Sequence, residues 1–257
     1  RMRDFISSSL AYHKAWEDVK VAEEIFSREA LLIGEDAVNR LHRRQVAVFG
    51  VGGVGGYVVE ALARAGVGAL TLVDADTVAL SNLNRQLIAT LDTVGMPKVE
   101  AMRARIARIA PDCRVTCLQT FYLPENADAI DLSAFDYVVD AVDTVSAKLE
   151  LAVRCQAAKV PLISAMGAGN KLDPAKLVVT DIYETSVCPL ARVMRRELRK
   201  RGVTALPVVY STEEARTPVL PDGTPSRTPG SISFVPGAAG LLLAGVVVRA
   251  LMEDTKC

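Results

Sequence analysis

Short apolar runs alternate with amphipathic stretches along the middle of the chain, and the two kinds of segment differ in period. The runs are four to six residues long and rich in Val, Ile and Leu, a pattern typical of buried strands. Strands are predicted at 45–50, 69–73, 114–118, 137–140 and 160–164. Apolar residues at helical spacing predict helices between them, at 57–65, 98–109 and 146–158. This alternation predicts an α/β fold, a Rossmann-like, doubly wound, mostly parallel sheet with helices on both faces.

Further elements are predicted on both sides of this region: helices at 15–25 and 29–42, a strand at 177–181, and helices at 190–201 and about 238–252. Residues 212–231 hold four prolines and two glycines among polar residues, which predicts a mobile surface loop. We expect an N-terminal extension over 1–24 and a single domain over 25–257. Its chemical motifs fall in 46–144, and a C-terminal extension follows the alternating region.

The most hydrophobic stretch, GAAGLLLAGVVV at 237–248, is followed at once by Arg249. As a helix it would rise about 18 Å, less than the roughly 30 Å of a bilayer's hydrocarbon core. We expect a buried core helix and no stable transmembrane segment, with peripheral membrane association as the alternative. Residues 1–30 carry charges throughout, so no secretory signal is predicted.

Composition excludes two classes of protein. Of the 257 residues 50% are hydrophobic, too many for a disordered chain, and 30 basic residues balance 30 acidic ones, which excludes a globally basic nucleic-acid binder. The five cysteines form no CxxC pair and are Cys113, Cys117, Cys155, Cys188 and Cys257. They favour a reduced, cytoplasmic protein without disulfides or structural zinc.

A glycine-rich turn follows the first predicted strand. The sequence QVAVFG runs into GVGGVGG at 50–56 and then into a helix, so glycines lie where a backbone can approach a phosphate at a helix N-terminus. Asp74, at the end of the next strand, stands where a carboxylate accepts hydrogen bonds from a ribose. These features suit a dehydrogenase that binds NAD as well as they suit an ATP-binding enzyme.

The next segments favour ATP. Arg85 and Lys98 follow in SNLNRQ and GMPKVE, and fixed cations of this kind stabilise the negative charge that develops during attack on a phosphorus atom. Asp143, in DAVDT after a strand, provides a carboxylate for magnesium. Hydride transfer requires no such pair of cations.

GVGGVGG, LVDAD, SNLNRQ, GMPKVE and DAVDT, in this order, resemble the nucleotide-binding domain of the ubiquitin-activating-enzyme-like superfamily, the ThiF-type enzymes. Three further blocks resemble its tRNA threonylcarbamoyladenosine dehydratase branch: FSREALLIG at 26–34, AMGAGNKLDP at 165–174 and PGSISFVP at 229–236. The resemblance covers about 25–252. It implies adenylation of a carboxylate with ATP and magnesium by a homodimer. In this branch, it implies ATP-dependent cyclisation of threonylcarbamoyladenosine at tRNA position 37, with loss of water.

The resemblance also implies roles for single residues. Asp74 would hold the ribose, Arg85 and Lys98 the phosphates, and Asp143 the magnesium. The residues expected around ATP are Gly50, Gly52, Gly53, Gly55, Asp74, Asp76, Asn82, Asn84, Arg85, Gln86, Lys98, Asp143 and Thr144. Arg28 matches an arginine that reaches the neighbouring subunit's ATP site and would act there with Arg85, Lys98 and Asp143. The alternative interpretation is that Arg28 is an ordinary charged residue at the start of a helix.

Two features outside these motifs have two interpretations each. The segment ARVMRRELRKR carries six basic residues against one acidic residue. On a helix Arg192, Arg195, Arg196 and Arg199 would share one face, either binding tRNA phosphates or merely solvated. Cys188 lies where some relatives place a thioester-forming or metal-binding cysteine, although a buried, inert thiol is favoured because no histidine is near in sequence.

Two other functions stay open. One is an adenylyltransferase that activates the C-terminal carboxylate of a sulfur-carrier or ubiquitin-like protein. The absence of CxxC pairs counts against it. The other is a non-catalytic nucleotide-binding scaffold in sulfur transfer. Such a scaffold would not need the cations at 85 and 98. A sulfur-relay protein is also a candidate partner, and the residues do not decide which tRNAs are used or which base closes the ring.

Overall fold

The computed structural model describes residues 24–253 and confirms the predicted fold class. Its strands are β1 (Gln45–Phe49), β2 (Ala69–Val73), β3 (Arg114–Leu118), β4 (Tyr137–Asp140), β5 (Leu162–Ala165), β6 (Leu177–Asp181) and β7 (Pro207–Ser211). They form one sheet in the order β3-β2-β1-β4-β5-β7-β6, in which β6 alone runs antiparallel to its neighbour. The order reverses between β1 and β4, which creates a crevice at the carboxyl ends of these two strands.

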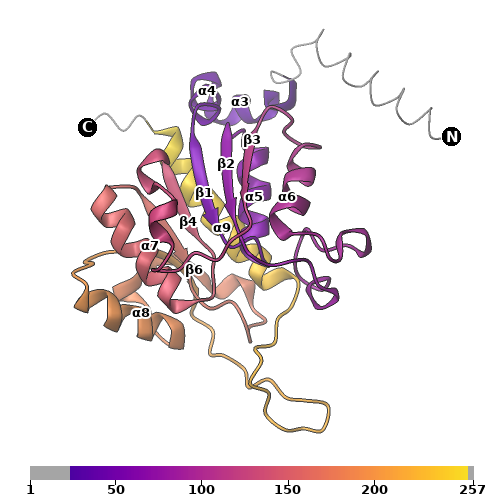
Figure 1. The fold of residues 1–257 in the computed structure, drawn as a ribbon, viewed down its shortest axis with the longest axis vertical. Coiled ribbons are helices and arrows are strands. Elements are labelled where there is room, and N and C mark those ends of the chain that lie inside the picture. The colour runs from indigo at the N-terminus through magenta and orange to yellow at the C-terminus, as the bar shows by residue number, and fades with distance from the viewer. Residues whose placement is uncertain (1–23, 254–257) are drawn as a thin grey trace, which may run out of the picture.

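Helices cover both faces of this sheet (Figure 1). They are α3 (Ser27–Ile33), α4 (Glu35–Leu41), α5 (Gly55–Arg64), α6 (Lys98–Ile106), α7 (Val145–Ala158), α8 (Pro189–Lys200) and α9 (Phe234–Met252). Single-turn 3-10 helices lie at Leu80–Asn82, Leu91–Thr93, Ala127–Ala129, Leu132–Ala134, Pro174–Lys176 and Ile182–Glu184. Alternate residues of β1 face opposite sides of the sheet and belong to two hydrophobic cores. Val46 and Val48 pack with α5, α6 and α9, whereas Ala47 and Phe49 pack with α7 and α8.

Several element boundaries differ from the sequence-based expectation. The helix predicted at 29–42 is two helices, because Gly34 has a φ of +84° that interrupts the helical backbone. Strand β7 was not predicted, and the last helix begins at Phe234 instead of about 238. The helix predicted at 15–25 lies almost entirely outside the described residues.

The apolar helix α9 packs along α5. A Cβ atom on Gly240 would lie 2.4 Å from the carbonyl oxygen of Val54 and 2.8 Å from the Cβ of Tyr57, so this glycine allows the two helices to touch. By length and composition α9 is the one helix among residues 24–253 that could cross a membrane, yet half of that span is buried inside the domain. Its burial is that of a core helix.

Candidate active site

A cleft of about 500 Å³ lies at the point where the strand order reverses. The parallel register places it there, because Phe49 pairs with Val73 on one side and with Asp140 on the other, so the segments after β1, β2 and β4 leave the sheet together. Ten of the residues predicted to surround ATP line it: Gly50, Gly52, Gly53, Asp74, Asp76, Arg85, Gln86, Lys98, Asp143 and Thr144. Three others, Gly55, Asn82 and Asn84, do not line it.

The glycine turn is shaped by close backbone contacts. A Cβ on Gly55 would lie 1.8 Å from the carbonyl oxygen of Gly50, and a Cβ on Gly50 would lie 2.7 Å from the carbonyl oxygen of Ala141. Gly55 therefore lets α5 begin directly against the turn, although it does not touch the cleft. At Gly52 and Gly53 a Cβ would meet only side chains and backbone at 3.4 Å or more, and both residues line the cleft, where a phosphate group fits.

Asp74 joins this turn to the end of β2. Its carboxylate accepts hydrogen bonds from the backbone N–H of Val51 at 2.7 Å and of Asp76 at 2.9 Å, and its side chain is 9% exposed. The carboxylate is therefore fixed before any ligand arrives, while the residue still lines the cleft.

Two cations lie on the walls of the cleft. Lys98, the first residue of α6, is buried, and its Nζ atom lies 2.6 Å from the carboxylate of Asp76 and 4.0 Å from that of Asp74. The half-buried Arg85 donates from one guanidinium nitrogen to the carbonyl oxygen of Ser81 at 2.8 Å. Both cations are thus held in place by the protein, as stabilisation of developing negative charge requires.

Asp143 is exposed in the segment that follows β4, and Thr144 donates a long hydrogen bond of 3.5 Å to it. Beneath this segment lies a buried group that sequence reasoning missed. Lys148 donates to Asp140 at 3.0 Å, to the hydroxyl of Ser164 at 3.3 Å and to a backbone carbonyl on β5 at 2.7 Å. The sequence signal that could have indicated this pair was an acidic residue at the end of a buried strand followed by a lysine on the next helix.

Asn82 and Asn84 have structural hydrogen bonds instead of positions in the cleft. The Oδ1 atom of Asn82 accepts from the backbone N–H of Ala79 at 3.0 Å and closes the turn before Arg85. Asn84 bridges Arg85 and the backbone of Ser231. Both side chains therefore lie outside the cleft lining, and their contact with the nucleotide stays a prediction.

No role in the site was predicted for the residues of the opposite wall. Segments 120–123, 165–169 and 228–231 line it. Phe121 exposes 62% of its surface there. The hydroxyl of Tyr122 and the Oε1 atom of Gln86 are buried without a hydrogen-bond partner among the described residues, and burial raises the pKa of Tyr122 to about 12. Both residues contribute to the cleft lining, but these two atoms are themselves buried within the domain.

Arg28 lies apart from the cleft of its own chain. It is exposed on α3, near the end of the sheet where β1 begins (Figure 1), whereas the cleft lies where β1 ends. No residue of α3 is buried, and Leu31 and Leu32 expose 89% and 85% of their surfaces.

The basic helix α8 does not present its four predicted arginines as one free stripe. Arg195 is half-buried and donates to the carbonyl oxygen of Thr185 at 2.9 Å, because it lies next to the buried face of the helix. Arg199 stacks on Tyr183, with the guanidinium 4.8 Å from the ring centre. Arg196 is 3.0 Å from Glu197, whereas Arg192 is exposed.

Cys188 is 5% exposed, which confirms the expected burial. Its backbone caps the start of α8, and a Cβ on Gly167 would lie 3.8 Å from its sulfur. Four cysteines among residues 24–253 are free thiols. In the same part of the chain, no three His, Cys, Asp or Glu side chains are grouped as a metal centre.

Comparison with known proteins matches the ThiF family over residues 26–256. A tRNA threonylcarbamoyladenosine dehydratase of Bacillus subtilis is 44% identical over 243 residues, which cover 90% of this chain and 96% of that protein. Among solved structures, the Escherichia coli tRNA N6-threonylcarbamoyladenosine dehydratase in complex with AMP is 35% identical, with a TM-score of 0.84 over 91% of this chain and 96% of that chain. Its complex with ATP has a TM-score of 0.81 at 34% identity and the same coverage.

Proposed function

The chain belongs to the ThiF family, and we propose that it catalyses the ATP-dependent dehydration of threonylcarbamoyladenosine at position 37 of tRNA. One observation carries the proposal. A cleft that combines a glycine turn, Arg85, Lys98 and Asp143 occurs in a chain that matches dehydratases of this name over nearly its whole length.

The proposed reaction has two steps. A carboxylate oxygen of the threonine attacks the α-phosphorus of ATP, the bond to the bridging oxygen breaks, and pyrophosphate leaves. A nucleophile within the same modified nucleoside then attacks the acyl carbon, loses its proton, and displaces AMP, which carries away one former carboxylate oxygen. The nucleoside closes into a ring and is lighter by one water. Such chemistry depends on positioning and on charge stabilisation, and no covalent cysteine is required.

Each cleft residue has a place in this scheme. The turn at Gly50, Gly52 and Gly53 would cradle phosphates, and Asp74 would accept hydrogen bonds from the ribose. Arg85 and Lys98 would bind the phosphoryl oxygens on which negative charge grows. Asp76, Gln86 and Thr144 complete the lining that a nucleotide would meet.

Magnesium fits this arrangement through Asp143. A magnesium ion in an ATP site takes one or two carboxylates and completes its shell with phosphate oxygens and water. The carboxylate of Asp143 is exposed on the cleft lining at the end of β4, so it can supply such a ligand. When bound, the ion would neutralise phosphate charge.

We further infer that the enzyme acts as a homodimer in which Arg28 serves the partner's site. Support comes from α3, whose leucines at 31 and 32 are almost fully exposed beside Arg28. An uncovered apolar helix that carries a basic residue is suited to docking on a second copy.

For the tRNA, we infer that the exposed part of α8 contributes phosphate contacts. Arg192, Arg196 and Arg199 remain on its solvent side, whereas Arg195 is engaged within the domain. Binding through such residues should weaken steeply with salt. With a tRNA substrate and free thiols in the described part of the chain, we expect a cytoplasmic enzyme; a sulfur-relay partner stays a prediction.

The test is mass spectrometry of nucleosides from threonylcarbamoylated tRNA incubated with the protein, ATP and magnesium. A nucleoside lighter by one water is expected, and Arg85→Ala or Lys98→Ala should slow its formation by about 10²–10³-fold. Arg108→Ala, which removes an exposed cation far from the cleft, is the matched control. An unchanged nucleoside with folded, ATP-binding protein would refute the dehydratase. Pyrophosphate exchange stimulated by a sulfur-carrier protein would then favour the adenylyltransferase, and no exchange the scaffold.

A further inference from the structure

One edge of the cleft is formed by Pro229, Gly230 and Ser231, a segment that we call the strap. The strap is the second stem of the loop at 212–231, which projects from the body of the domain (Figure 1). A ligand bound in the cleft therefore meets the strap at its base, while the outer part of the loop is free to contact a larger substrate.

Asn170 holds both stems of this loop. Its Oδ1 atom accepts from the backbone N–H of Gly230 at 2.6 Å, and its own N–H donates to the carbonyl oxygen of Gly230 at 2.8 Å. Its carbonyl oxygen accepts from the N–H of Arg216 at 2.9 Å, in the first stem. Asn170 has a φ of +61°, a conformation that asparagine tolerates better than most residues.

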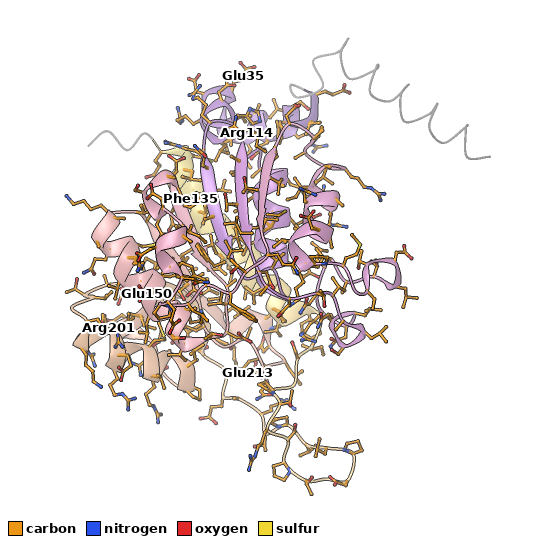
Figure 2. The ribbon with its side chains drawn as sticks, viewed as in Figure 1. Glu35, Arg114, Phe135, Glu150, Arg201 and Glu213 are labelled. Carbon is orange, nitrogen blue, oxygen red and sulfur yellow. The ribbon has the colours of Figure 1, made fainter. Side chains whose placement is uncertain are left out.

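A second anchor fixes the first stem to the same segment. The carboxylate of Glu213 accepts hydrogen bonds from the backbone N–H of Leu172 and of Asp173, the latter at 2.9 Å. These bonds, of which that from Asp173 has the largest effect, hold the pKa of Glu213 below its ordinary value. Figure 2 shows Glu213 at the base of the projecting loop. Glu213 thus ties the first stem, and Asn170 the strap, to the same segment at 170–173.

Asn84 connects the strap to Arg85. Its Nδ2 group donates to the carbonyl oxygen of Ser231 at 3.0 Å, and its Oδ1 atom accepts from a guanidinium nitrogen of Arg85 at 2.9 Å. Both ends of the amide are used, one on each partner. The same guanidinium nitrogen also donates to Ser81, so two acceptors fix its direction.

We propose that Asn84 is a positioning residue that couples the orientation of Arg85 to the strap, which Asn170 anchors. The proposal rests on the proposed function only in assigning Arg85 to the phosphates of ATP. A guanidinium misplaced by a lost hydrogen bond still attracts the phosphates electrostatically, but it no longer matches the oxygens in the transition state. Loss of Asn84 should therefore lower kcat while the KM for ATP stays nearly constant.

The kinetic test is a double-mutant cycle on the full-length protein. Asn84→Ala and Asn170→Ala should each reduce kcat about tenfold, the effect of one hydrogen bond to a charged group, with the KM for ATP changed by less than about threefold. The double variant should be about as slow as either single variant, because both substitutions interrupt one connection. Asn39→Ala, on the exposed side of α4, is the control, and thermal unfolding verifies that every variant folds.

Two kinetic results would overturn the coupling. If Asn84→Ala raised the KM for ATP and left kcat unchanged, Asn84 would be an ordinary nucleotide ligand. If the two losses multiplied in the double variant, the residues would act independently.

A spectroscopic measurement tests the coupling whether or not the protein is a dehydratase. The ¹⁵N signals of the Arg85 side chain, assigned through Arg85→Lys, should shift in Asn170→Ala, although the contacts of Asn170 are with the strap and with the loop's first stem. Unchanged Arg85 signals would refute the coupling. An inactive wild-type protein in which those signals do shift would refute only the dehydratase function.

Discussion

Removing the ammonium group of Lys148 should destabilise the domain more than any exposed charge substitution. The side chains of Lys148 and Asp140 are 0% and 1% exposed, and their charged atoms lie 3.0 Å apart. In Lys148→Met, Asp140 keeps the hydroxyl of Ser164 and the N–H of Val142 as donors but loses its counter-ion. Breaking a buried ion pair from one side costs about 3–5 kcal/mol, against a total stability of about 5–15 kcal/mol for a typical domain.

The assay is urea unfolding followed by circular dichroism, with the free energy of unfolding extrapolated to water. Lys200→Met is the matched control, because Lys200 is 63% exposed in its pair with Glu197 and should lose less than about 1 kcal/mol. Adding Asp140→Asn to Lys148→Met should recover stability, since the uncompensated charge disappears. A loss below about 1 kcal/mol for Lys148→Met would refute the reasoning, because it would mean that water reaches the pair.

Three further predictions concern the turn, the acid response and the assembly. Gly55→Ala should abolish ATP binding measured by calorimetry, because a Cβ there would lie 1.8 Å from the carbonyl oxygen of Gly50 in the turn. The control is Gly245→Ala on α9, where the added Cβ would meet only the flexible end of an arginine side chain, and this variant should bind ATP normally. Burial raises the pKa of Glu60, but the hydrogen bonds and charges of Arg105 and Arg64 together outweigh it and hold the pKa below its ordinary value of 4.5. The contribution of Glu60 to stability is therefore present above about pH 4.5 and is lost as the pH falls through the folded-state pKa. Glu60→Gln should flatten the acid limb of a plot of melting temperature against pH. An unchanged acid limb would contradict this prediction. Mixing inactive Arg28→Ala and Lys98→Ala proteins should restore about a quarter of wild-type activity through one intact site per mixed dimer, and no recovery after verified subunit exchange would exclude the role of Arg28 in the partner's site.

The fold class and much of the candidate site followed from local sequence patterns. Buried parallel strands must be short apolar runs, and their carboxyl ends meet at one edge of the sheet, so Asp74 and Asp143 could be assigned to one crevice without coordinates. Arg85 and Lys98 were predicted because attack on a phosphorus atom needs fixed cations and because their motifs resemble those of ThiF-type enzymes. All four line the cleft of the folded chain.

Side-chain direction could not be predicted in the same way. Asn84 belongs by sequence to the block that contains Arg85, yet its amide bonds to Ser231, 147 residues further along the chain. Helical spacing put Arg195 on one face with its neighbours, whereas the packing of α8 turned it toward Thr185.

The order of the elements and the chemistry available at the strand ends could be deduced from the chain without coordinates, because both depend on residues close together in it. Which polar groups are buried, and what they contact, became known only from the packed fold. Lys148 is an ordinary charged residue in sequence, and it becomes the counter-ion of Asp140 only when α7 packs on β4 and β5. The physical reason is that burial and hydrogen-bond geometry are set by segments distant in the chain, which local periodicity does not describe.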